Sequence, residues 1–149
     1  RAIKEQRKVE IRSPHAIRPW QHVLEPLNGY MLLARRLYEE GPAYGEAWNF
    51  GPDDSDAKPV SWIVEELMRL WPDAPGYILD PKEHPHEAGY LRLDCSKAKN
   101  RLSWKPVWSL DIALEKIVEW NVAIGRNEDA YDVCLNQIRE FEAQRSEEK

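Results

Sequence analysis

Basic and aromatic side chains are concentrated in one short segment, residues 12–23, which contains two arginines, two histidines and a tryptophan. Pro14 and Pro19 restrict their own φ angles and push the residue before each of them towards an extended conformation, so we expect a stiff loop. On such a loop the guanidinium of Arg18 is held at a set angle and suits bidentate hydrogen bonds to phosphate or carboxylate oxygens. Trp20 could exclude solvent or stack on a flat ring. The segment predicts an anion site, although these residues equally allow Arg18 to pair with a local carboxylate and Trp20 to lie in the core.

A second polar segment, residues 84–87, reads His-Pro-His-Glu. Two imidazoles and a carboxylate are suitable ligands for zinc or iron. However, Pro85 separates the two histidines, and no second spaced pair of ligands is present. We therefore predict a polar loop without a metal, in which His86 and Glu87 orient a ligand or a neighbouring arginine.

The composition limits the class of protein to which these segments belong. The chain has 149 residues, 42% of them hydrophobic and 32% charged, which predicts one folded domain. Its net charge of −5 and isoelectric point near 5.4 speak against a nucleic-acid surface. No apolar run approaches the length of a membrane span and no signal peptide opens the chain, so we expect a cytoplasmic protein. Cys95 and Cys134 have no metal-ligand or redox spacing, and both are expected to be reduced, mostly buried thiols.

Hydrophobic periodicity predicts the elements that position these residues. Apolar residues with helical spacing give the first helix, from Leu24 to about Glu40, an inward face of Leu24, Leu27, Met31, Ala34, Leu37 and Tyr38. Further helices are expected over residues 61–71, 94–102, 110–124 and from 127 towards a charged tail, and residues 1–7 resemble the frayed end of a helix. Short strands are expected over residues 8–11, 46–50, 76–80 and 91–93, which places Asn49 at the end of a strand. The fold class is therefore α/β with about five helices.

Motifs that usually supply chemistry in an α/β protein are missing from the sequence. There is no glycine-rich dinucleotide turn, no P-loop, no GxSxG and no tyrosine followed four residues later by a lysine. We therefore predict no catalytic, cofactor-binding or metal-binding residue in this chain.

Five segments together closely resemble the C-terminal half of the CDP-glucose 4,6-dehydratases, a branch of the extended short-chain dehydrogenase/reductase (NAD-dependent epimerase/dehydratase) family. These segments are residues 11–23, 46–52, 58–63, 83–88 and 90–98. The run Ile17-Arg-Pro-Trp-Gln-His-Val23 stands in place of the generic Ile-Arg-Asp-Trp-x-x-Val of that family, and His86-Glu87 with Tyr90 replaces its His-Asp-x-Arg-Tyr. These departures favour the CDP-sugar branch over other dehydratases.

The resemblance implies a lobe that binds a sugar nucleotide, over residues 1–144, followed by a charged tail over residues 145–149. It implies that Arg18 binds the diphosphate and that Asn49 and Tyr90 close around it. Arg12 could approach the cytosine or ribose, while His86 and Glu87 order their loop. The candidate substrate-binding residues are Arg18, Asn49, Tyr90, Arg12, Trp20, His22, His86 and Glu87.

The resemblance also implies what the complete enzyme contains. Such enzymes carry NAD and the catalytic Thr, Tyr and Lys on an N-terminal Rossmann half, and they convert CDP-glucose to CDP-4-keto-6-deoxyglucose and water. None of that half is in this sequence, so the chain is expected to be an inactive fragment whose partners are CDP-glucose, the missing half and possibly a second copy. A non-catalytic nucleotide- or protein-binding module of the same ancestry is the alternative. Conversion of sugar nucleotides for a surface polysaccharide is the process that the resemblance suggests.

Overall fold

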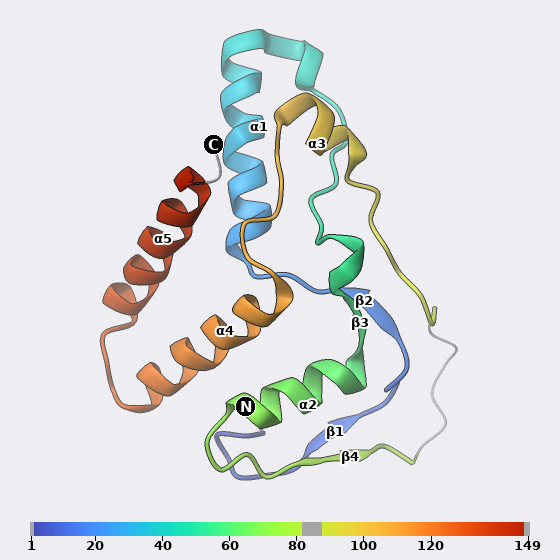
Figure 1. Cartoon of the computed structure of the whole chain (residues 1–149), viewed down its shortest axis with the longest axis vertical. Coiled ribbons are helices and arrows are strands. Elements are labelled where there is room, and N and C mark those ends of the chain that lie inside the picture. The colour runs from blue at the N-terminus through green and yellow to red at the C-terminus, as the bar shows by residue number, and fades with distance from the viewer. Residues whose placement is uncertain (1, 82–87, 148–149) are drawn as a thin grey trace.

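The computed structural model describes residues 2–81 and 88–147 and shows five α-helices and four short strands arranged in two small sheets (Figure 1). The helices are α1 (Leu24–Glu40), α2 (Val60–Leu70), α3 (Ser96–Leu102), α4 (Leu110–Gly125) and α5 (Ala130–Glu147). The strands are β1 (Val9–Ile11), β2 (Ile17–Pro19), β3 (Ala57–Pro59) and β4 (Tyr77–Leu79), and the 3₁₀ turns η1 and η2 cover Gly41–Tyr44 and Asp54–Asp56. No helix in this part of the chain combines the length and the hydrophobicity needed to cross a bilayer.

Each of the two sheets is a single pair of strands. β1 and β4 are parallel, with Val9 opposite Tyr77 and Ile11 opposite Leu79. β2 and β3 are antiparallel, with Arg18 opposite Lys58. Pro19 therefore ends an extended segment, residues 17–19, which forms a strand, whereas Pro14 lies in a turn that is closed by a hydrogen bond from the N–H of Ala16 to the carbonyl oxygen of Ser13.

Three hydrophobic clusters hold the helices together. Ile63 of α2 packs on Leu110 and Leu114 of α4, and Phe50 packs with α3 and the buried Trp104. The third cluster joins Trp108 to Phe141 of α5, with Leu24 and Ile112 packed against it. The helices that the sequence predicts near these positions are all present, and Ser109 caps α4 as expected, since its Oγ accepts a hydrogen bond from the N–H of Ile112.

The face that α1 turns inward differs from the prediction. Leu27, Met31, Leu37 and Tyr38 are exposed, whereas Glu25, Asn28 and Gly29 are buried. Burial of Glu25 is possible because its carboxylate accepts hydrogen bonds from the backbone N–H groups of Val107 and Trp108, at 3.0 and 2.8 Å. The periodicity predicted the helix correctly and its buried side wrongly.

Two predicted strands and one predicted helix end are also wrong. Residues 47–50 and 91–93 belong to no strand, although Tyr90 forms an isolated bridge with Ile17. Residues 2–6 form turns instead of a helix end. At the other end of the chain, α5 continues to Glu147, beyond the position where the charged tail was expected to begin.

Candidate functional site

Arg18 and Tyr90, which are far apart in the sequence, are brought together by backbone pairing. The N–H of Ile17 donates to the carbonyl oxygen of Gly89 at 2.9 Å, and the N–H of Leu91 donates to the carbonyl oxygen of Ile17 at 3.1 Å. Tyr90 is thereby aligned with Ile17, next to Arg18 on β2. The Arg18 side chain is partly buried, and its Nη1 donates to the carbonyl oxygen of Ile17 at 2.9 Å. The guanidinium is thus anchored at one edge to its own strand.

A polar cleft of about 610 Å³ adjoins Tyr90 and Asn49. One wall is Pro52, Asp53 and Asp54, and the other is Arg92 to Ser96 with Lys99 of α3. Asn49 is exposed, and its Nδ2 donates to the carbonyl oxygen of Asp94 at 3.2 Å. Asn49 is therefore joined to the second wall of this cleft.

The polar cleft is lined by two cations, Arg92 and Lys99, which pair with Asp54 and Asp53, and by a third carboxylate, Asp94, which accepts a hydrogen bond from the N–H of Ser96. The Arg92 guanidinium lies 4.9 Å from the centre of the Tyr90 ring and 3.2 Å from Asp54 Oδ1. The Nζ of Lys99 lies 2.5 Å from Asp53 Oδ1, and this hydrogen bond raises the pKa of Lys99. Such exposed pairs contribute little net stability, about 0–1 kcal/mol each. An incoming anion would therefore replace Asp54 and Asp53 as the partners of Arg92 and Lys99 at a low cost in free energy.

Arg92 and Lys99 were missed as site residues by the sequence analysis. Arg92 lies in a segment that alternates leucine with polar residues, a pattern that predicts the two faces of a strand, and Lys99 lies in the predicted helix over residues 94–102. The useful signal was the spacing between Tyr90 and Arg92, because a cation two residues after an exposed aromatic ring can lie over that ring once the segment leaves regular strand geometry.

Trp20 and His22 face away from the polar cleft. The Nε1 of Trp20 donates to the carbonyl oxygen of Lys58 at 3.0 Å, and its ring packs on the α2–α4 cluster. Trp20 therefore joins β3 to the core. A core position for Trp20 is the alternative that the sequence left open.

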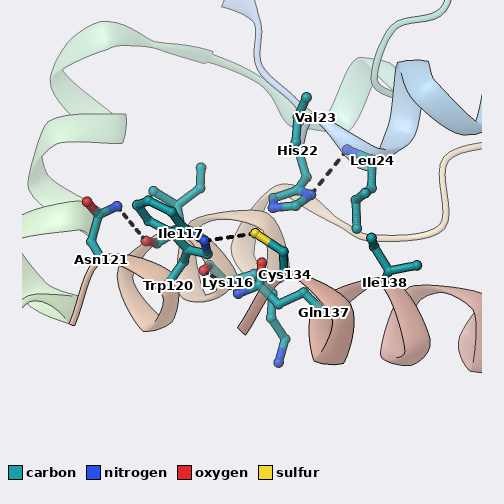
Figure 2. Close-up of a pocket in the computed structure, with 10 residues that line it drawn as sticks. All are labelled: His22, Val23, Leu24, Lys116, Ile117, Trp120, Asn121, Cys134, Gln137 and Ile138. Carbon is teal, nitrogen blue, oxygen red and sulfur yellow. Dashed lines mark hydrogen bonds between the residues drawn. The ribbon is translucent and has the colours of Figure 1, made fainter. Parts of the chain in front are cut away.

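His22 is 6% exposed and lines an apolar pocket of about 380 Å³, shown in Figure 2. Its Nδ1 accepts a hydrogen bond from the N–H of Leu24 at 3.3 Å, and its ring meets Trp108 edge-on, with 4.9 Å between ring centres. Burial, and then the positive charge of Lys116, lower the pKa of His22. The imidazole is therefore held neutral, which suits a packing role.

Besides Val23 and Leu24, the rest of the lining of this apolar pocket comes from α4 and α5, and Cys134 of α5 is exposed there, not buried as expected. Trp120 and Cys134 lie within it, and the indole Nε1 of Trp120 donates to the Sγ of Cys134 at 3.2 Å (Figure 2). Gln137 donates to the carbonyl oxygen of Lys116 at 2.8 Å. Because these polar groups are bonded to one another, the pocket presents a mainly apolar surface.

Arg12 is not among the residues that line the polar cleft. Arg12 is exposed and directly follows β1, where the N–H of Asp80 donates to the carbonyl oxygen of Ile11 at 2.9 Å. His86 and Glu87 lie outside the described residues. Within the part of the chain that the structure describes, no three His, Cys, Asp or Glu side chains are grouped so that they could hold a metal ion.

No family model matches the sequence of this chain, but comparison with known proteins identifies a relative. The relative is a CDP-glucose 4,6-dehydratase from Salmonella typhimurium strain LT2, which is 49% identical to this chain over 141 residues. The match takes in 95% of this chain and 39% of the relative, so the chain spans about two fifths of the relative's length. Over nearly its whole length, this chain is similar to the C-terminal part of a CDP-glucose 4,6-dehydratase.

Proposed function

We propose that this chain is the sugar-nucleotide-binding part of a CDP-glucose 4,6-dehydratase. The observation that carries the proposal is the 49% identity over 95% of the chain to a protein of that name. The complete enzyme would convert CDP-glucose to CDP-4-keto-6-deoxyglucose and water with the help of NAD. Residues 1–144 would form the binding lobe and residues 145–149 its charged end. We further propose a cytoplasmic location and a role in supplying sugars for a surface polysaccharide.

The contribution of this chain is binding and orientation of the substrate. Arg18 would hold the diphosphate, and the support for this role is that its guanidinium is anchored on β2 beside the segment that carries Tyr90. Tyr90 and Asn49 border the polar cleft, where Arg92 and Lys99 add positive charge opposite Asp54 and Asp53. A nucleoside diphosphate lying between β2 and this cleft would exchange these exposed carboxylates for its phosphate oxygens.

The described residues do not fit NAD. A dinucleotide's diphosphate usually rests on a helix N-terminus that follows a strand through a glycine-rich turn. Here α1 follows β2 without a glycine, and the buried carboxylate of Glu25 already occupies its first turn. α2 follows β3 directly at Pro59 and Val60. NAD is therefore assigned to the remaining part of the complete enzyme, and no step of the reaction is derived through it.

Calorimetric titration of the chain tests this proposal. CDP and CDP-glucose should bind more tightly than UDP-glucose or NAD, and the Arg18→Ala variant should weaken CDP-glucose binding by about tenfold or more, because a charge-assisted hydrogen bond contributes about 1.5–3 kcal/mol. Arg126→Ala is the matched control, since Arg126 is an exposed arginine at the end of α4, and it should bind as the wild-type chain does. The chain alone should show no dehydratase turnover. Tighter binding of NAD than of any CDP ligand, or equal losses in the two variants, would contradict the proposal.

A further inference from the structure

His22 brings a hydrogen-bond donor to the apolar pocket shown in Figure 2. Its Nδ1 accepts the hydrogen bond from the N–H of Leu24, so this nitrogen carries no proton. In a neutral imidazole the proton is then on Nε2, which makes Nε2 a donor. Figure 2 shows Nε2 on the side of the ring away from Leu24, above Trp120 and Cys134. Among the residues that the structure describes, none accepts a hydrogen bond from Nε2.

The direction of this donor is fixed by the surroundings of the ring. His22 is 6% exposed, and its ring meets Trp108 edge-on on one side while Nδ1 is bonded to Leu24 on another. The ring therefore cannot turn Nε2 out into bulk water without losing both contacts. A buried donor without an acceptor raises the free energy of the folded protein. An acceptor atom supplied by a ligand in the pocket would remove that cost.

The other polar groups of the pocket are engaged with the protein itself. Nδ2 of Asn121 donates to the carbonyl oxygen of Ile117 at 2.8 Å, as Trp120 and Gln137 donate to their own partners. The Nζ of Lys116 is paired with Glu119 at 2.8 Å and also with Glu140. Because two carboxylates already share the charge of Lys116, this lysine does not select an anion. The pocket therefore favours an uncharged ligand.

The size and walls of the pocket fit a small molecule. Its volume of about 380 Å³ lies within the range of small-molecule sites, about 300–1,000 Å³. Ile117, Trp120 and Ile138 contribute apolar side chains to its walls. Apolar walls with very few placed polar groups are the usual composition of such a site, in which the polar group fixes the orientation of the ligand. Here that group is Nε2 of His22.

We propose that this pocket binds an uncharged, mainly apolar small molecule, one oxygen of which accepts a hydrogen bond from Nε2 of His22. The apolar body of the ligand would pack on Ile117, Trp120 and Ile138. The pocket and the polar cleft share no lining residue, so this inference does not rest on the proposed function. The site should distinguish a carbonyl compound from a hydrocarbon of the same shape.

Two probes of equal shape test the proposal on the chain as it stands. Acetophenone has a carbonyl oxygen where α-methylstyrene has a methylene group, and both are uncharged. In NMR titrations, acetophenone should shift the indole N–H signal of Trp120 and the methyl signals of Ile117 and Ile138. Acetophenone should bind about fivefold more tightly than α-methylstyrene, which is the gain expected from one hydrogen bond. Equal affinities of the two probes, or no shifts at these three residues, would overturn the inference.

A pair of matched variants assigns the preference to His22. His22→Phe keeps an aromatic ring beside Trp108 but has no donor, so the two probes should bind it with equal affinity. His15→Phe makes the same change at an exposed position outside the pocket and should keep the preference for acetophenone. A preference that survives in His22→Phe would contradict the proposal. Pocket signals that move with protein concentration, and with neither probe, would assign the pocket to a second copy and also overturn it.

Alkylation of the unsubstituted chain gives a second measurement, which does not depend on the folding of a variant. Cys134 lines the pocket and is exposed, whereas Cys95 is buried, so N-ethylmaleimide should label Cys134 selectively. Acetophenone at ten times its dissociation constant should slow this labelling about tenfold, because only the protein without bound probe reacts. The reaction of N-ethylmaleimide with glutathione in the same solution is the control and should keep its rate. Unchanged labelling of Cys134 would show that the probe does not enter the pocket.

Discussion

Neighbouring residues of one short segment serve three different parts of this molecule. Arg18 is anchored to its own strand beside Tyr90, Trp20 enters the core, and His22 closes an apolar pocket. The sequence predicted the stiffness of this segment, because proline restricts the backbone wherever it stands. It could not predict the separate directions of the side chains, since these depend on Lys58 and Trp108, which are distant in the sequence.

For the candidate site, too, the sequence predicted residues but not the long-range contacts that arrange them. Arg18, Asn49 and Tyr90 were chosen from residue types and resemblance. In the structure Tyr90 pairs with Ile17 next to Arg18, and Asn49 is hydrogen-bonded to Asp94 in a wall of the polar cleft. The cleft itself depends on ion pairs between Asp53 or Asp54 and a segment about forty residues later. No local pattern carries that information, which is why Arg92 and Lys99 were not identified. Whether these residues bind substrate stays a prediction.

The buried His22 should make the stability of the chain depend on pH. Its pKa is lowered in the folded state, whereas the unfolded chain takes up the proton near pH 6.5. Below about pH 6.5 the unfolded state therefore binds more protons than the folded state, and the free energy of unfolding falls as the pH falls through this window. One such group gives a slope of at most about 1.4 kcal/mol per pH unit. Urea unfolding between about pH 5.5 and 7.5 measures that slope.

Two substitutions separate His22 from the other titrating groups. His22→Asn keeps an acceptor for the N–H of Leu24 but cannot titrate, so the slope should become smaller. His15→Asn removes an exposed imidazole, and the slope should stay as in the wild-type chain. A slope that survives in His22→Asn would show that another group is responsible.

At the scale of the elements, the five helices were predictable from the sequence, and so were two of the four described strands, β1 and β4, whereas β2 and β3 were not expected as strands. A helix forms its hydrogen bonds within one segment, so its period is visible in the sequence over α1, α2 and α4. A strand exists only when it is paired, and residues 47–50 pair with none of the strands that the structure describes. Hydrophobic periodicity also predicts an apolar stripe along a helix, but it does not indicate which other element packs against that stripe. In α1 the buried side is instead set by Glu25 and Asn28, whose hydrogen-bond partners come from residues 107, 108 and 145.

The close approach of α1 to Phe50 requires a glycine. A Cβ at Gly29 would lie 2.3 Å from Cδ1 of the buried Phe50 ring. Gly29→Ala should therefore lower the free energy of unfolding, because overpacking costs about 1–3 kcal/mol and exceeds the gain of up to about 1 kcal/mol in helix propensity. Gly125→Ala in α4 is the matched control, since nothing lies within 4 Å of its Cβ position, and it should be neutral or stabilising. Urea midpoints compare the two variants, and equal stability would mean that the Phe50 ring moves aside.

At the scale of the whole molecule, the described chain leaves much of its apolar surface uncovered. Neither sheet has more than two strands, and such sheets are marginal unless they pack on something else. Ile78 and Leu79 of β4 are exposed, although parallel strands are normally covered on both faces. Exposed apolar side chains of α1, among them Met31 and Tyr38, extend this pattern to a second element. One large partner surface would account for these features together, whereas a small ligand would account for only one hollow.

A polar substitution on the exposed side of α1 should therefore affect the isolated chain and the complete enzyme differently. Met31 is 72% exposed in the chain, so Met31→Gln should change its free energy of unfolding by less than about 0.5 kcal/mol. In a chimera that joins this chain to the unmatched part of the Salmonella relative, the same amide would be buried without a partner and should cost about 1–3 kcal/mol. Glu115→Gln, at an exposed position of α4, is the control and should leave both proteins unchanged. The urea midpoints of the isolated chain and the chimera, each with and without these substitutions, provide the test. A loss confined to the chimera that carries Met31→Gln means that this side of α1 is covered there, and equal effects in both backgrounds mean that it is open.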